Sequence, residues 1–328
     1  MKKFQVCFYI IMLIISACSD FKGNEDDVEA SLSSTSSSNT SNDDSDTSDD
    51  SDTSISYKDL YGIAFGNNKF IAVGQNGVMR SSSDNGSSWD NVTSGTTTHL
   101  YETAFGNDTF ISVGQRGTIR QSTDNGSTWS SGTWGERSNL NGVAHGNNTF
   151  VALGTNSSFI RSTDNGSNWD TISTTNLVDV AFGNSTFVGC GANGAIYSSD
   201  DNGSSWTSRT SGSTGFDLKG LTFGNNQFFA LGQSGKLIKS TNNGSSWSNV
   251  DSQVSNYLYS IAFGNNKYVG VGSRTVIVSS DNGSNFTQTL DNTTFQDVTF
   301  GNGIFVAVGS REIIYTSTDG DTWTKVHP

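Results

Sequence analysis

One repeated phrase limits what this chain can fold into more than any other feature. The phrase is Ser-x-Asp-Asn-Gly-x-x-Trp, and residues 122–129 show it in full. Its acidic position recurs along the chain at Asp84, Asp124, Asp164, Asp201, Asn242, Asp281 and Asp319. The successive spacings are 40, 40, 37, 41, 39 and 38 residues. Seven copies with a period near forty residues predict an array of small structural units, each one copy long.

The phrase itself predicts a tight turn. Asp and Asn side chains accept hydrogen bonds from backbone N–H groups a few residues later, and Gly adopts a positive φ without steric cost. The Trp that follows starts the next strand as a large apolar anchor. Three copies depart from the pattern: Asn242 replaces Asp in the fifth, Phe286 replaces Trp in the sixth, and residues 317–323 of the seventh are one residue shorter. The shortening leaves the geometry of the seventh turn open.

The phrase resembles the Asp-box, or BNR, repeat of sialidases and other β-propellers. That resemblance implies a structural repeat and no catalytic role for the turns. Sialidases of this kind share a Phe/Tyr-Arg-Ile-Pro motif, whereas the only proline here is Pro328. Asp-Asn-Gly also lacks the alternating carboxylates and the distal Glu of a calcium loop. We therefore expect seven structural turns, no metal and no cofactor.

Residues 57–328 divide into seven units of about 39 residues. A unit begins with Leu-x-x-(Ile/Val)-Ala-Phe-Gly-Asn, as in residues 60–67 and 258–265. A second apolar run, a third run, the Asp turn and a Trp-led segment follow. Short runs separated by Gly and Asn, with one Pro and no helical periodicity, indicate an all-β chain. Four antiparallel strands in each unit predict a seven-bladed β-propeller.

The whole domain carries a second resemblance. Phe-Gly-Asn-x-x-Phe-Val-Ala-Val-Gly, a third strand and a Ser-x-Asp turn follow one another in residues 300–320 and, with Ile71 in place of the first Val, in residues 65–86. This order is similar to a broad bacterial set of Asp-box propellers that includes the photosystem II assembly-factor type. The resemblance implies the fold and a tendency to bind proteins, and it implies no photosynthetic role.

Residues 1–18 are expected to be a secretory signal. Lys2 and Lys3 precede an apolar run over residues 4–15, which is too short for a spanning helix. The closing Ile15-Ser16-Ala17-Cys18 resembles a bacterial lipobox, which implies cleavage before Cys18 and lipid on that residue. Ser19 after the Cys fits the outer-membrane sorting pattern of such lipoproteins. The alternative is an ordinary signal peptide. We expect a lipid-anchored protein of the cell envelope.

Residues 19–56 are expected to be a disordered acidic tether. Of the 24 residues from Ser31 to Ser54, 23 are Ser, Thr, Asp or Asn, so the segment cannot bury enough surface to fold. Its eleven acidic residues against Lys22 give a net charge of −10, out of −13 for the chain. The acidic balance therefore says little about the partner of the domain, and we expect no nucleic acid.

The two ends of a blade should differ in role. In a meander, the turns after the first and third strands lie at one end, here called the lower face. The remaining connections lie at the other end, the upper face. The lower turns are uniform and predict a scaffold, whereas the upper loops vary and predict function. The sequence leaves ring closure open between blade packing alone and an added outer strand from residues 55–58.

Arginine marks the upper face. Arg116, Arg274 and Arg311 occupy equivalent places between the second and third strands of blades two, six and seven. Arginine captures carboxylates or phosphates and is frequent at protein interfaces. The other candidates on this face are Tyr61, Tyr101, Tyr257, Tyr259, Trp134, Glu136 and Arg137. An ordinary solvated role for all of them is the alternative. We predict a monomeric protein-binding or assembly module, without enzymatic activity, whose partner is an envelope protein or a glycan.

A propeller that binds or hydrolyses glycans is the second hypothesis. Hydrolysis needs paired carboxylates, and Glu102, Asp179 and Asp297 share the position of Gly62 in the first strand. A surface protein with no ligand is the third. Cys190 and His145 replace apolar residues of other units, so we expect both to be packed in the core. No His or Cys spacing suggests zinc.

Overall fold

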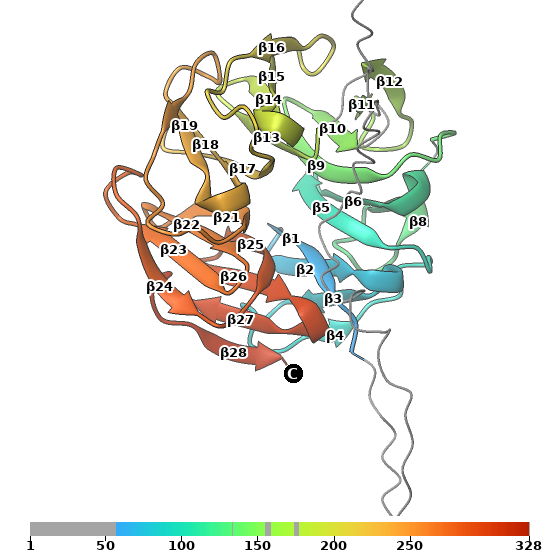
Figure 1. The fold of residues 1–328 in the computed structure, drawn as a ribbon. Helices are drawn as coiled ribbons and strands as arrows, with labels where there is room; N and C mark the ends of the chain where they lie inside the picture. The colour runs from blue at the N-terminus through green and yellow to red at the C-terminus, as the bar shows by residue number, and fades with distance from the viewer. Residues whose placement is uncertain (1–56, 133, 155–158, 174–176, 328) are drawn as a thin grey trace, which may run out of the picture. The chain divides into compact units, whose positions relative to one another are not determined.

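The computed structural model describes residues 57–132, 134–154, 159–173 and 177–327. The predicted signal, the lipidation site at Cys18 and the acidic tether lie outside these residues, so those predictions stay predictions. The described residues form seven four-stranded antiparallel sheets, each made of strands that follow one another in the chain. Figure 1 shows the first strand of every sheet around the centre of the ring. The predicted seven-bladed propeller is confirmed.

The strands of each blade, numbered 1 to 7 in chain order, run from the centre outward. The innermost strands are β1 (Leu60–Gly66), β5 (Leu100–Gly106), β9 (Leu140–Gly146), β13 (Asp179–Gly183), β17 (Leu218–Gly224), β21 (Leu258–Gly264) and β25 (Phe295–Gly301). The second strands are β2 (Lys69–Gly74), β6 (Thr109–Gly114), β10 (Thr149–Gly154), β14 (Thr186–Cys190), β18 (Gln227–Gly232), β22 (Lys267–Gly272) and β26 (Ile304–Gly309).

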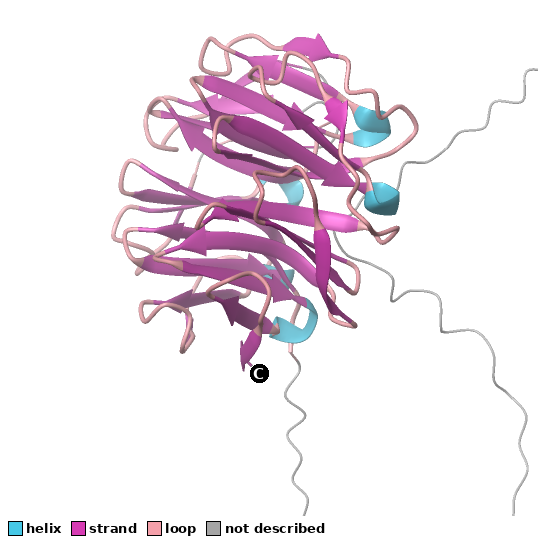
Figure 2. Cartoon of the chain, turned by 90° about the vertical axis from the view of Figure 1, so that its left-hand side faces the viewer, coloured by secondary structure: helices cyan, strands magenta, loops and turns pink. Residues whose placement is uncertain are grey.

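The outer half of each blade is shorter. The third strands are β3 (Met79–Ser82), β7 (Ile119–Ser122), β11 (Phe159–Ser162), β15 (Ile196–Ser199), β19 (Leu237–Ser240), β23 (Thr275–Ser279) and β27 (Ile314–Ser317). The outermost strands are β4 (Asp90–Asn91), β8 (Ser130–Ser131), β12 (Asp170–Ser173), β16 (Thr207–Arg209), β20 (Ser248–Asn249), β24 (Thr287–Asp291) and β28 (Thr324–His327). Five 3-10 turns, cyan in Figure 2, join second to third strands: η1 (Gln75–Gly77), η2 (Gln115–Gly117), η3 (Ala192–Gly194), η4 (Gln233–Gly235) and η5 (Ser310–Glu312).

The hydrophobic core lies between blades. Each of seven clusters of buried side chains combines residues of two neighbouring blades. In one of them, Ile71 and Val73 of blade 1 pack against Leu100 and Phe110 of blade 2. Each fully buried aliphatic or aromatic side chain contributes about 1.5–3 kcal/mol. Cys190 is fully buried in the cluster between blades 4 and 5, as predicted.

The ring closes by blade packing. Among the described residues, the sheet of blade 7 consists of β25 to β28, and residues 57 and 58 lie in no strand, whereas residues 55 and 56 lie outside the described chain. Across this junction, Leu60 and Ile63 of blade 1 share a cluster with Val306 and Val308 of blade 7. Polar contacts at the junction, described below, complete the closure.

Candidate binding face

The lower face is made of turns that satisfy their own polar groups. In blade 1, Ser82 Oγ donates to Asp84 Oδ1 (2.8 Å) and accepts from Gly86 N (2.8 Å). Asp84 Oδ1 also accepts from Ser88 N at 3.0 Å, and Oδ2 accepts from Ser88 Oγ at 2.6 Å. Trp89 Nε1 donates to the carbonyl of Gly86 (3.1 Å). This unit is here called the acidic turn, and its bonds engage both oxygens of its carboxylate.

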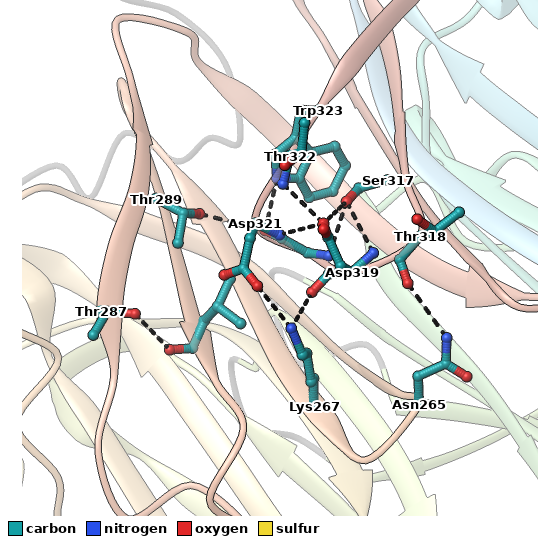
Figure 3. Close-up of polar contacts among 12 residues, drawn as sticks. Asn265, Lys267, Thr287, Thr289, Ser317, Thr318, Asp319, Asp321, Thr322 and Trp323 are labelled. Atoms are coloured by element: carbon teal, nitrogen blue, oxygen red, sulfur yellow. Dashed lines mark hydrogen bonds and ion pairs between the residues drawn. The ribbon is translucent and has the colours of Figure 1, made fainter.

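The three irregular copies keep the same turn. Asn242 Oδ1 accepts from Ser246 N (3.0 Å), and its Nδ2 donates to Ser246 Oγ (2.9 Å). Phe286 is buried and takes the place of the Trp ring. In the shortened turn of Figure 3, Gly320 N still donates to Ser317 Oγ (2.8 Å), across three residues where blade 1 uses four. The open question of the seventh turn is thereby resolved.

The lower turns also join neighbouring blades. At six of the seven junctions, the side chain of the Asn that directly follows an innermost strand reaches the acidic turn of the next blade. Hydrogen bonds between side-chain amides join Asn107 to Asn165, Asn147 to Asn202, Asn184 to Asn243, Asn225 to Asn282 and Asn302 to Asn85. At the other two junctions, Asn125 donates to the carbonyl of Asn67 and Asn265 to that of Thr318. The turns of the lower face therefore have a structural role, because they connect neighbouring blades of the ring.

Acid should loosen the acidic turns. Hydrogen bonds from Ser88 and then Ser82 lower the pKa of Asp84 from 3.8 to about 2. A carboxylate with a lowered folded-state pKa stabilises the fold above its unfolded pKa, and this contribution is lost as the pH falls. We expect the melting temperature to fall between about pH 4 and pH 2. A variant with Asn at positions 84, 124 and 164, the arrangement seen at Asn242, should lose less across this window. An equal loss in variant and wild type contradicts this account.

The carboxylates of the second hypothesis bind backbone groups between blades. Asp297 is 5% exposed, and its Oδ2 accepts from Ile63 N (2.7 Å) of blade 1. Its Oδ1 accepts from Val298 N (2.8 Å) and from the hydroxyl of Ser260. Asp179 Oδ2 likewise accepts from Leu221 N (2.7 Å) of the next blade. An innermost strand has unpaired edge groups, and these carboxylates satisfy some of them.

The third carboxylate makes a local contact. Glu102 is half-buried, and its Oε1 accepts from Thr103 N at 3.0 Å. The side chains of Glu102, Asp179 and Asp297 are thus hydrogen-bonded to backbone at the inner strands. This arrangement gives them a structural role in joining or bracing these strands.

The upper face presents the arginines on strained turns. Arg116, Arg274 and Arg311 have φ values of 56°, 53° and 57°, a region that favours Gly and Asn. The equivalent Asn76 and Asn193 have φ of 53°. In each turn the backbone N–H is held by the residue before the next innermost strand: Arg116 N donates to Asn139 Oδ1 (3.0 Å). These hydrogen bonds fix the backbone position from which each arginine side chain extends into solvent.

The three arginine side chains are exposed and carry uncompensated charge. Arg274 Nη2 donates to the Asn292 amide oxygen (2.9 Å), which is neutral. Within the described part of the chain, the ion pairs involve Arg80, Lys219, Lys267 and His327, and none of these three arginines. An exposed guanidinium without a carboxylate partner is available to a ligand. All three lie in the turns that join second to third strands, at the upper face, and their role in binding stays a prediction.

The predicted aromatic candidates divide into buried and accessible groups. Tyr61 and Tyr101 are only 3% and 2% exposed, and their rings pack together with centroids 6.0 Å apart. The structure therefore assigns both to the interior, because each ring is covered by its neighbour and by His99. Tyr259 is half-buried and stacks on Tyr257 (6.2 Å).

The loop between blades 2 and 3 also contributes. Trp134 is half-buried against the core, and its Nε1 donates to Thr171 Oγ1 (3.4 Å). Glu136 and Arg137 beside it are exposed. Arg137 is therefore accessible to a partner, whereas Trp134 fixes the loop.

Sequence reasoning missed two of the exposed aromatic residues. The exposed large apolar side chains of the described chain are Tyr57 (41%), Phe216 (39%) and Tyr257 (38%). All three precede an innermost strand, so they lie on the upper face. Lys236 Nζ stands 5.5 Å from the ring centroid of Phe216, in cation–π contact. Their position just before each Leu-initiated strand was the available signal.

A cleft of about 700 Å³ opens on the upper face of blade 1. Its walls are η1 and the connection from β4 to β5, and they include Lys58, Asn76, Asn91 and Thr96, with Met79 at its buried floor. One cation among hydroxyl and amide groups suits hydrogen bonding to a polar or anionic chain. The cleft lies beside the point where the described chain begins.

His145 is half-buried and packs on a neighbouring aromatic ring, as predicted, but at a cost in stability. Its ring lies 4.6 Å from that of Phe150, where other blades have Phe, and its Nε2 is buried without a hydrogen bond. Burial lowers the pKa of His145 below 6.5. Because the folded state holds the neutral form, the unfolded chain takes up the proton first, and His145 lowers the stability progressively as the pH falls below about 6.5. His145→Phe should raise stability by about 1 kcal/mol, and by more in acid. Phe182→His, the reverse change, should destabilise; thermal melts at two pH values test both.

Among the described residues, no cluster of three or more His, Cys, Asp and Glu is placed to bind a metal ion. No helix in that same part of the chain is long and apolar enough to cross a membrane.

Known proteins share this architecture. The sequence pattern of the DUF6242 β-propeller domain matches residues 173–297. No curated protein matches the chain. YCF48 bound to D1 peptide is 16% identical, with a TM-score of 0.65 over 80% of this chain and 92% of that one. A Niastella koreensis GH74 enzyme is 16% identical (TM-score 0.66; 81% and 54% covered). The WD40 propeller of Doa1 is 14% identical (0.64; 79% and 92%). These likenesses show the β-propeller fold.

Proposed function

We propose that this protein is a binding or assembly module that captures a protein partner on its upper face. The observation that carries the proposal is the asymmetry between the faces. The exposed aromatic residues and the arginines without ion pairs lie on the upper loops, whereas the lower turns are occupied by bonds within the ring. Aromatic residues and arginine are the side chains that dominate protein interfaces.

The partner is an extended protein segment with carboxylates. Tyr257, Phe216 and Lys236 offer apolar surface and a cation over blades 5 and 6, and Arg274 and Arg311 continue the charge over blades 6 and 7. Arginine binds carboxylates through two parallel hydrogen bonds. A propeller of this fold, YCF48, has been solved with a peptide bound, which supports the class of partner.

The glycan hypothesis has weaker support. A GH74 enzyme shares the fold at 16% identity. The candidate carboxylates of this chain, however, bind backbone N–H groups of the innermost strands, and Asp297 is nearly covered. Paired carboxylates for hydrolysis need to flank a bound sugar. We therefore place protein binding first.

The test uses asparagine, which these turns already accept. Residues 19–328 are immobilised and exposed to solubilised envelope extract and to a glycan array. Arg116→Asn, Arg274→Asn and Arg311→Asn together should remove specific protein capture while preserving the fold, because Asn76 and Asn193 adopt the same φ. The control neutralises Lys69 and Lys325, which lie away from the upper loops. Capture that survives the arginine changes contradicts the proposal, and glycan binding that survives them favours the second hypothesis.

We also propose lipid anchoring at Cys18 in the outer membrane. The lipobox-like residues 15–18 and the following Ser19 support it. Labelling with an alkynyl fatty acid should mark the wild-type protein and not Cys18→Ser, which should leave the membrane fraction. Labelling of the Ser variant contradicts the assignment. The acidic turns resemble the Asp-box repeat of bacterial propellers, and this resemblance supports both proposals.

A further inference from the structure

The described chain begins beside the arginines of the upper face. Tyr57 is 41% exposed and precedes β1 on that face. Lys58 N donates to Glu312 Oε1 (3.2 Å), and Asp59 Oδ1 accepts from the backbone N of Arg311 (2.9 Å). The acidic residues that precede Tyr57 in the sequence are therefore attached next to Arg311.

The cations on this side outnumber the free anions. Arg311, Arg274 and Arg116 belong to blades 7, 6 and 2, which with blade 1 form a continuous arc in the ring (Figure 1). Lys58 lines the adjacent cleft. The carboxylates nearby are Asp59, which caps the Arg311 turn, Asp291, which accepts from the Asn292 amide, and the exposed Glu136 in the loop beside η2. This set of cations, Lys58, Arg116, Arg274 and Arg311, is here called the cationic arc.

The sequence before Tyr57 has the complementary charge. Residues 40–56 contain six Asp and no Lys, Arg or His, so they carry −6 at pH 7. The acids lie 5 to 14 residues before Tyr57. For a flexible chain, those separations correspond to root-mean-square reaches of about 12–21 Å. Lys58 and Arg311 lie at the attachment point, and the other two cations follow along the arc.

We propose that the acidic segment of residues 40–56 docks on the cationic arc of its own propeller. Single exposed ion pairs are weak, but the attachment at Tyr57 gives the segment an effective concentration of about 1 mM or more. The docked segment covers the arginines and excludes other anionic chains at low salt. Salt screens such contacts, so the arc is exposed at higher ionic strength. The exclusion of a partner rests on the proposed function, whereas the docking itself does not.

The occupant follows from charge and attachment. An external anionic peptide must reach the arc from solution, while this segment is held beside it. Its Ser and Thr residues have small side chains, which fit against the exposed loops without clashes. The segment therefore acts as a competitor that a specific partner displaces with its aromatic contacts at Phe216 and Tyr257.

Direct binding tests the docking without any partner. A fluorescent peptide of residues 40–56 is titrated into the propeller of residues 57–328 at about 20 mM salt, and anisotropy is recorded. This part is used alone because all its sheets draw their strands from within it. We expect binding that is lost for the peptide with six Asp→Asn changes and weakened about tenfold by the three Arg→Asn changes. Equal binding of both peptides, or by both propellers, overturns the inference.

The longer chain supplies the intramolecular arm. Residues 19–328 should bind the same peptide several-fold more weakly than residues 57–328, because the arc is already occupied. The six Asp→Asn changes within that chain should restore binding. Equal affinity of the two wild-type lengths overturns the inference. Because no envelope protein is present, a failure of the proposed partner leaves this result unaffected, and the pull-down remains informative if docking fails.

Discussion

Replacing Glu312 by alanine should lower the free energy of unfolding by about 3 kcal/mol, because it breaks a nearly buried ion pair at the ring closure. Glu312 of blade 7 is 4% exposed and binds the guanidinium of Arg80 in blade 1. It also accepts from Lys58 N (3.2 Å). Its removal leaves Arg80 desolvated without its counter-charge and a backbone N–H without an acceptor.

The backbone conformation at Glu312 is unfavourable for a residue with a side chain. The equivalent position is Gly in the other 3-10 turns, yet Glu312 has a φ of 57°. A non-glycine residue in this region is strained, so the carboxylate offsets a local cost. Alanine keeps the backbone strain and removes the carboxylate. The loss of stability therefore measures the contribution of the carboxylate alone.

A thermal melt of the propeller checks this result. About 3 kcal/mol corresponds to a fall of ~6–12 °C for a domain of this size. The matched control is Asp321→Ala, which breaks the exposed pair with Lys267 (2.7 Å) and should cost less than about 1 kcal/mol. Similar losses in the two variants contradict a closure that depends on Glu312. His327 lies 3.7 Å from the same carboxylate, and burial and then Arg80 hold its pKa below 6.5.

Gly301→Ala should destabilise the propeller by about 3 kcal/mol through overpacking. A Cβ at Gly301 would overlap the ring of Phe65 in blade 1. That ring cannot move freely, because it packs on Phe70 with centroids 4.6 Å apart. The same contact of an inner-strand glycine with the aromatic ring of the next blade recurs around the ring, as between Gly66 and Phe105.

Two further variants distinguish overlap from a general effect of losing glycine. Gly135→Ala is the control, because no atom lies within 4 Å of its Cβ position, and it should change stability by less than about 0.5 kcal/mol. Gly301→Ala combined with Phe65→Ala should lose less than the sum of the single changes, since the overlap is relieved. Strict additivity in urea unfolding contradicts the packing account.

Much of the fold was predictable from one phrase and its period. The acidic turn is a local structure, so its bonds follow from neighbouring residues such as Ser82, Asp84 and Gly86. The blade count follows from the period, and the scaffold role of the lower face follows from its uniformity. Even Asn242 keeps the turn, because an amide oxygen accepts the same backbone bond.

The contacts between blades were not predictable in the same way. Tyr61 and Tyr101 are alike in sequence position, but their burial arises from each other across a blade boundary. Asp297 has the sequence position of a carboxylate at the mouth of the ring, but its bonds to Ile63 and Ser260 join it to the neighbouring blades, which are far away in the sequence. The exposure of the arginines, in contrast, follows from the sequence, because turn residues at a blade end have no strand neighbour to cover them.

The most direct test of the account is a crosslinking map made in the cell envelope. p-Benzoylphenylalanine replaces Phe216 and Tyr257 on the upper face, and Thr123 and Asp200 in the exposed acidic turns of the lower face. The account predicts that irradiation gives protein adducts from the two upper positions and none from the lower pair. The Arg116, Arg274 and Arg311 changes to Asn should abolish those adducts. Adducts from Thr123 or Asp200, with none from Tyr257, contradict the upper face as the binding surface.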